Sequence, residues 1–139
     1  MNDVKNIFDV GASSMSAQLV RMNTLASNIA NANSVSNTPE GAYRTLRPVF
    51  ETIYSGQVGD VDAVATMRAT EVVELDREPE ELYRPDHPLA NENGMIYAST
   101  VNVEEEMVEM MESSRQYQNT LEVISTMRTL MARTVRMGG

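Results

Sequence analysis

Cysteine and tryptophan are absent from this 139-residue sequence, and aromatic residues make up only 5% of it. Without cysteine, neither a disulfide framework nor a thiolate metal site can form. His87 is the single histidine, so a histidine-based metal site is not expected either. Because aromatic side chains are few, we expect the core to consist mainly of Met, Leu, Val and Ile.

Positive charge is also scarce in the chain. The sequence contains 11 Lys and Arg residues and 20 Asp and Glu residues. The resulting net charge of −9 argues against nucleic acid as a partner. Residues 34–101 contain 12 acidic and 5 basic residues (net −7), whereas residues 2–33 are neutral and residues 102–139 have a net charge of −2. We therefore expect the ends of the chain to pack inward and the acidic middle to face solvent or a different partner.

Long apolar runs and catalytic motifs are missing as well. No stretch approaches the ~20 apolar residues that span a membrane, and the first residues lack the basic region of a secretory signal. These rules predict no membrane insertion and a cytosolic protein, unless an export route reads an uncleaved N-terminus. We find no nucleophile–base pair, phosphate loop or metal-ligand constellation, so the sequence predicts no catalytic residue, no cofactor and no enzyme activity.

Both ends of the chain have apolar residues at a spacing of seven, which places them on one stripe of an α-helix. The first stripe, widened by one leucine, consists of Phe8, Met15, Leu19, Met22 and Ile29. The second stripe and its flanks consist of Val103, Met107, Met110, Tyr117, Leu121, Ile124 and Met131. A pair of such helices leaves much apolar surface uncovered, so we predict that these residues form interfaces between subunits.

The predicted helices are long, about Val4 to Ala32 and Val103 to Arg136, which is roughly 40 to 50 Å each. Helices of this length would protrude from a compact domain of this size, whose radius of gyration is near 14 Å. An ordinary bundle with interrupted helices is the alternative. Asn102 is a suitable N-cap for the second helix, and the acidic residues 104–106 that follow it are better explained by the helix dipole than by an acid–base site.

The middle of the chain has a different pattern. Residues 47–54 read as a strand, residues 55–60 as a turn, and residues 61–75 as a second strand or pair of strands. Residues 82–88 read as a proline-pinned extended connection, followed by a short apolar stretch at 95–97. The predicted fold is mainly α, with N- and C-terminal helices paired as an antiparallel coiled-coil-like rod and a small β subdomain of short strands between them. The corresponding parts are residues 1–33, 34–101 and 102–139.

Several motifs resemble those of the bacterial flagellar axial proteins. They are Phe8–Gln18 with Arg21-Met22-Asn23, the Asn-rich Ala26–Ser36 with Tyr43-Arg44, Pro85–Ala90 before Asn93-Gly94, and Val101-Asn102-Val103. Within that family the chain resembles one of the short proximal rod proteins more than the other. The hook and distal-rod members have a much larger middle domain. The alternatives are the other short rod protein and a cytosolic coiled-coil adaptor or chaperone-like binding protein.

The resemblance implies a structural subunit of the flagellar rod that assembles helically with copies of itself and with other rod proteins. It implies export by the flagellar type III apparatus without signal cleavage, a position in the rod across the periplasm, and transmission of torque without a cofactor. The signature junction maps to Asn28, Asn31, Asn33 and Tyr43. We expect Asn31 to hold the junction between the first helix and the middle, and a solvated helix cap is the alternative.

Overall fold

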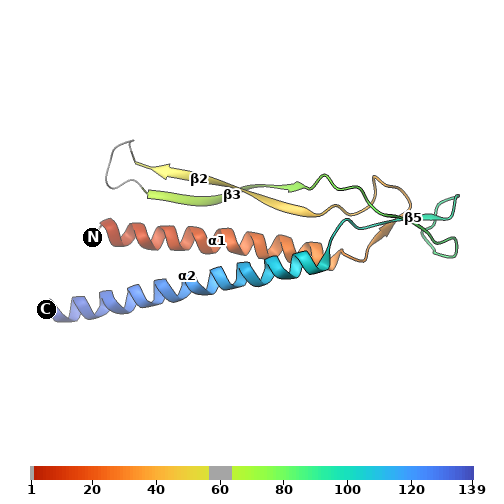
Figure 1. The fold of residues 1–139 in the computed structure, drawn as a ribbon. Coiled ribbons are helices and arrows are strands. Elements are labelled where there is room, and N and C mark those ends of the chain that lie inside the picture. The colour runs from red at the N-terminus through yellow and green to blue at the C-terminus, as the bar shows by residue number, and fades with distance from the viewer. Residues whose placement is uncertain (1, 57–63) are drawn as a thin grey trace.

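The computed structural model describes residues 2–56 and 64–139, and side chains from residue 6 onward in the first helix. Helix α1 spans Asn2–Ala30 and helix α2 spans Val103–Met137. The two helices lie side by side and run in opposite directions, so that both chain termini are at the same end of an elongated molecule (Figure 1). The prediction of two long helices with a small antiparallel β region between them is confirmed.

Helix α2 begins and ends at local signals in the sequence. The side chain of Asn102 accepts hydrogen bonds from the backbone N–H groups of Glu104 and Glu105, at 3.1 and 3.2 Å. These are donors that the first helical turn otherwise leaves without a partner. At the other end, the N–H of Gly138 donates to the carbonyl of Thr134 at 3.1 Å. The predicted N-cap is therefore confirmed.

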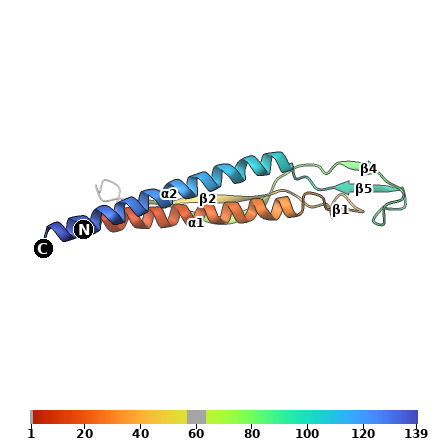
Figure 2. The ribbon, with the colours of Figure 1, turned by 90° about the horizontal axis from the view of Figure 1, so that it is seen from below.

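The buried positions on both helices lie next to the predicted stripes. On α1 the buried positions Gly11, Gln18 and Leu25 are seven residues apart, and on α2 the buried positions Glu106 and Ser113 have the same spacing. A Cβ atom built on Gly11 would lie 2.5 Å from Cδ1 of Ile124, so the absent side chain allows close approach of the helices. Figure 2 shows the same pair of helices from below, with α1 and α2 inclined to each other.

Strands β2 (Leu46–Ser55) and β3 (Val64–Glu74) form an antiparallel pair that folds back along α1 (Figure 1). At 10 and 11 residues they correct the expectation that all strands would be short. They are long because α1 covers them over most of their length. The hydroxyl of Ser13 on α1 bonds both the N–H and the carbonyl of Met67, so a helix side chain pairs with the backbone of β3. The turn predicted at 55–60 lies largely outside the described residues.

A second sheet lies at the far end of the molecule, in the strand order β1-β5-β4. It contains β1 (Val35–Ser36), β4 (Glu81–Tyr83) and β5 (Met95–Ala98), all antiparallel. Gly94, just before β5, has φ +75°, a conformation that glycine adopts without strain. The predicted extended connection at 82–88 is wrong beyond Tyr83, because residues 85–89 form turns, with Ala90 N–H bonded to the carbonyl of His87 at 2.9 Å.

Candidate functional site: the junction of helices and strands

Asn28, on the last turns of α1, is the central residue of the junction between helices and strands. Its amide group donates to the carbonyl of Leu46 and to Oε2 of Glu106, each at 2.9 Å. Its Oδ1 atom accepts from the N–H of Leu46 at 2.9 Å and from the hydroxyl of Tyr43 at 3.0 Å. All four hydrogen-bonding positions of a buried amide are thus used. One side chain joins α1 to the start of β2 and to α2.

Glu106 is the buried charge of the junction, with a side chain that is 0% exposed. Arg47 on β2 reaches it with two nitrogens, NH1 to Oε2 at 3.0 Å and NH2 to Oε1 at 2.6 Å. A two-point contact between guanidinium and carboxylate is among the strongest and most directional side-chain pairs. Because the carboxylate also accepts from Asn28, the charge is buried with its hydrogen bonds made.

The junction continues outward through a second ion pair. Arg77, which follows β3, donates to both carboxylate oxygens of Glu105 at 3.0 and 3.2 Å, and Arg44 donates to the carbonyl of Arg77 at 2.6 Å. The hydrogen bond from Arg77 lowers the pKa of Glu105 below its ordinary value near 4.5. Burial alone would lower the pKa of Arg47, but the hydrogen bond and charge of Glu106 outweigh that effect and raise it.

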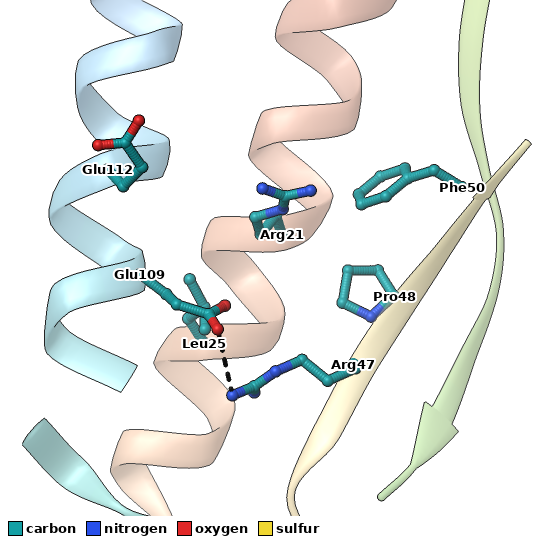
Figure 3. A pocket seen from close by; sticks show the side chains of 7 residues that line it. All are labelled: Arg21, Leu25, Arg47, Pro48, Phe50, Glu109 and Glu112. Carbon is teal, nitrogen blue, oxygen red and sulfur yellow. Dashed lines mark ion pairs between the residues drawn. The ribbon is translucent and has the colours of Figure 1, made fainter. Parts of the chain in front are cut away.

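A cavity of about 280 Å³ lies where α1, α2 and β2 meet, next to the buried pair (Figure 3). Its lining combines apolar and charged side chains: Arg21, Leu25, Arg47, Pro48, Phe50, Glu109 and Glu112. The guanidinium of Arg21 lies 5.0 Å from the centre of the Phe50 ring, at cation–π distance. Arg47 extends toward Glu109, whose carboxylate lies 3.7 Å from its guanidinium, and the dashed line in Figure 3 marks this ion pair. These contacts link the three elements and need no bound molecule to explain them.

The predicted junction residues divide into two groups. Asn28 and Tyr43 lie at the centre of the junction, bonded to each other. Asn31 does not hold it: its amide donates to the carbonyl of Ser27 at 2.8 Å, within its own helix end, which corrects our expectation. Asn33 is exposed. Asn31 lies just after the last residue of α1, and its amide bonds back to that helix end.

Seven of the predicted interface residues are half-buried within the chain, and five are exposed. Those that are half-buried are Phe8, Met15, Met22, Ile29, Met110, Tyr117 and Ile124. Those that are exposed are Leu19, Val103, Met107, Leu121 and Met131. A helix that faced only its partner helix would bury one stripe and expose polar residues elsewhere. Here apolar side chains continue around α2, which is the pattern expected of a surface that meets another protein.

Sequence reasoning misses the charged half of the junction. The pattern assigns Glu106 to the start of a helix, and it singles out neither Arg47 nor Arg77. One feature of the sequence could have indicated that Glu106 is buried: Glu106 and Ser113 are polar residues seven positions apart, next to an apolar stripe. In the described residues, no group of His, Cys, Asp or Glu is arranged to hold a metal ion, and no described helix is long and apolar enough to cross a membrane.

Comparison with known proteins agrees with this architecture at both ends of the chain. Residues 8–37 match the family described as flagella basal body rod protein, and residues 92–137 match the family described as flagellar basal body rod FlgEFG protein C-terminal. The first match covers most of α1 and the turn after it, and the second covers β5 and α2.

Similar proteins match over almost the whole chain. Flagellar basal-body rod protein FlgC of Salmonella typhimurium is 35% identical, that of Escherichia coli O6:H1 is 36% identical, and that of Yersinia enterocolitica is 37% identical. Each alignment covers 96% of this chain and 96% of the relative. The chain belongs to the FlgC family of flagellar basal-body rod proteins, in agreement with the resemblance found in its motifs.

Proposed function

We propose that the protein is a structural subunit of the proximal rod of the flagellar basal body, where it assembles helically with copies of itself and with other axial proteins. The observation that carries this proposal is the match to FlgC proteins over 96% of both chains. The apolar side chains left open on both helices support it, because a subunit of an assembly needs surfaces that its own fold does not cover.

In this proposal α1 and α2 act as an antiparallel coiled-coil-like rod. Support comes from the seven-residue spacing of Gly11, Gln18 and Leu25 on one helix and of Glu106 and Ser113 on the other. Between the two helices, the amide of Gln18 on α1 donates to the side-chain oxygen of Gln116 on α2 at 2.7 Å. Torque would then pass through packed helix surfaces, and the buried junction would fix the angle between these helices and the strands. Such a role requires no catalysis and no cofactor.

We also propose an export route and a location for the subunit. The subunit would leave the cytoplasm through the flagellar type III export apparatus without signal cleavage, and it would take its position in the part of the rod that spans the periplasm. Export as an extended chain agrees with the absence of cysteine, since no disulfide has to form before or after passage.

A matched pair of substitutions tests the predicted interface. Leu121 on α2 and Leu89 in the turn region before β5 are exposed to the same extent, 48% and 49%. Leu121→Asp places a charge on the predicted subunit interface, whereas Leu89→Asp places the same charge outside the helices. In cells that lack the native gene, we expect the Leu89 variant to restore motility and the Leu121 variant to be exported without completing a rod.

Mass spectrometry of isolated basal bodies gives the second readout of this experiment. The unaltered protein should be present in them, and the Leu121 variant should be found in the export fraction only. Normal motility of the Leu121 variant would show that this position is not at an interface. A protein that stays in the cytosol as a dimer of fixed size would favour the adaptor and contradict the proposal.

A further inference from the structure

Helix α2 contains two ten-residue segments that match in apolar pattern and are opposite in charge. We call residues 103–112 the acidic segment and residues 127–136 the basic segment. A shift of 24 residues aligns the apolar positions Val103, Met107, Val108 and Met111 with Met127, Met131, Ala132 and Val135. The same shift aligns Glu104, Glu109 and Glu112 with Arg128, Arg133 and Arg136. Each segment contains charged residues of one sign only.

The helix dipole explains only part of this arrangement. Its effect is confined to the first and last turns, where Glu104, Glu105, Glu106 and Arg136 lie. Glu109, Glu112, Arg128 and Arg133 lie further inside the helix. Pairing within the chain does not account for the rest, because the ion pairs found among the described residues involve Glu105, Glu106 and Glu109 but neither Glu112 nor the arginines of the basic segment.

Both segments expose apolar side chains next to these charges. Val108 and Met111 of the acidic segment are 66% and 71% exposed, and Val135 of the basic segment is 74% exposed. The three arginines of the basic segment are exposed as well. The end of α2 extends beyond the N-terminal end of α1 (Figure 1), so its last turns are open on several sides. Each segment therefore has exposed apolar residues next to exposed charges of one sign, and in the acidic segment these exposed charges are Glu104 and Glu112.

We propose that the basic segment of one copy packs on the acidic segment of a second copy. The two α2 helices are parallel and staggered by 24 residues, which is about 36 Å along the helix. The occupant is a second copy because the charge that each segment requires is the charge that the other segment carries. This inference rests on the proposed function, since it requires copies of the chain to meet in the rod.

The stagger determines the kind of assembly. A contact between two different surfaces of identical subunits is heterologous, and each added copy leaves one acidic and one basic segment free. The contact can therefore be repeated along an open helical structure. An antiparallel pair of α2 helices would also match the charges, but it would use both segments of both copies and close into a dimer.

Cross-linking tests the contact, and the chain provides a background free of cysteine. The double variant Val108→Cys/Ala132→Cys places one thiol in each segment, 24 residues apart and thus too far apart to join within one helix. It is expressed in cells without the native gene, and isolated basal bodies are treated with a short bismaleimide. The control is Val108→Cys/Val123→Cys, whose second site is also exposed, at 57%, and is nine residues out of the proposed register.

We expect a ladder of covalent oligomers from the first variant and none from the control. If basal bodies contain the protein but give no ladder, the stagger is wrong and the proposed function stands. If the protein is absent from basal bodies, the proposed function fails and this inference fails with it. A product that stops at the dimer identifies the closed antiparallel pair and overturns the inference. An equal ladder from the control would show contact without this register, and would also overturn it.

Charge reversal provides a second test with unmodified apolar contacts. Glu104→Arg/Glu112→Arg and Arg128→Glu/Arg136→Glu each place like charges in the contact, and we expect each to reduce rod completion roughly tenfold or more. The chain that combines all four changes restores opposite charges and should recover assembly. Loss of assembly in the combined chain, with helix content by circular dichroism equal to that of the parent, would contradict a contact between these two segments.

Discussion

Replacing Arg47 by Met is expected to destabilise the protein more than most single substitutions, because it leaves the Glu106 carboxylate buried without its charge partner. The Glu106 side chain is 0% exposed, and two of its hydrogen bonds come from Arg47. The bond from Asn28 remains, but an amide does not neutralise a carboxylate. Breaking a buried ion pair from one side costs about 3–5 kcal/mol, and we expect a loss of that size in the free energy of unfolding.

Replacing Glu106 by Gln should reduce the free energy of unfolding by a smaller amount, because Arg47 keeps other partners. In Glu106→Gln the Arg47 side chain, which is 17% exposed, keeps contacts with Glu105 at 3.4 Å and Glu109 at 3.7 Å. The Gln side chain can still pair with Asn28. We therefore expect a loss of about 1–3 kcal/mol, as for a weakened buried hydrogen bond. The double variant Arg47→Met/Glu106→Leu removes both charges and should be more stable than Arg47→Met alone.

Urea unfolding followed by circular dichroism measures these differences through the shift of the midpoint at constant slope. Protein and salt concentrations must be equal in all samples, because association between copies would add apparent stability. The reasoning is refuted if Arg47→Met is no more destabilising than Glu106→Gln. It is also refuted if the double variant is as unstable as the sum of Arg47→Met and the matching single variant Glu106→Leu, since the two residues would then act independently.

The remaining contacts of the junction and of the helix pair lead to three more predictions. Asn28→Leu should reduce the free energy of unfolding by at least about 2 kcal/mol, because it leaves buried partners without hydrogen bonds, whereas Asn31→Leu should have a much smaller effect in the same urea assay. The lowered pKa of Glu105 stabilises the fold above pH 4.5, and this contribution is lost as the pH falls through the lowered value. Because Arg77 is the main cause of the lowered pKa, Arg77→Gln should make stability depend less steeply on pH in the acid range. Gly11→Val should cost about 1–3 kcal/mol by overpacking the helix contact, and a thermal melt unchanged from the parent would contradict that close approach.

Local patterns in the sequence are sufficient to predict the helices and the positions of both long strands. The seven-residue spacing locates α1 and α2 to within a few residues, and Asn102 marks the start of α2, because periodicity and capping depend on neighbours in the chain. The strand predicted at 47–54 lies within β2, and the strand or pair of strands predicted at 61–75 contains the single strand β3. Motifs at both ends of the chain are specific enough in combination to indicate the family.

The length and placement of the β2–β3 pair depend on tertiary structure. An isolated two-stranded sheet is marginally stable in water, so a sequence reading favours short strands there. Helix α1 changes this by covering the strands, and its Ser13 bonds the backbone of β3. Nothing in the local sequence of residues 46–74 indicates that a helix lies against it.

The composition of the junction is also decided by tertiary structure. Asn28 and Asn31 look equivalent in sequence, and which amide meets β2 depends on how α1 is rotated against the strands. Glu106 reads as a residue of a helix start, since its partner Arg47 is 59 positions away in the chain. A buried charge is tolerated only where distant segments bring its partners together, and the positions of those segments are set by packing. The sequence by itself therefore determined the elements and the family, and the tertiary structure determined which polar residues join the elements.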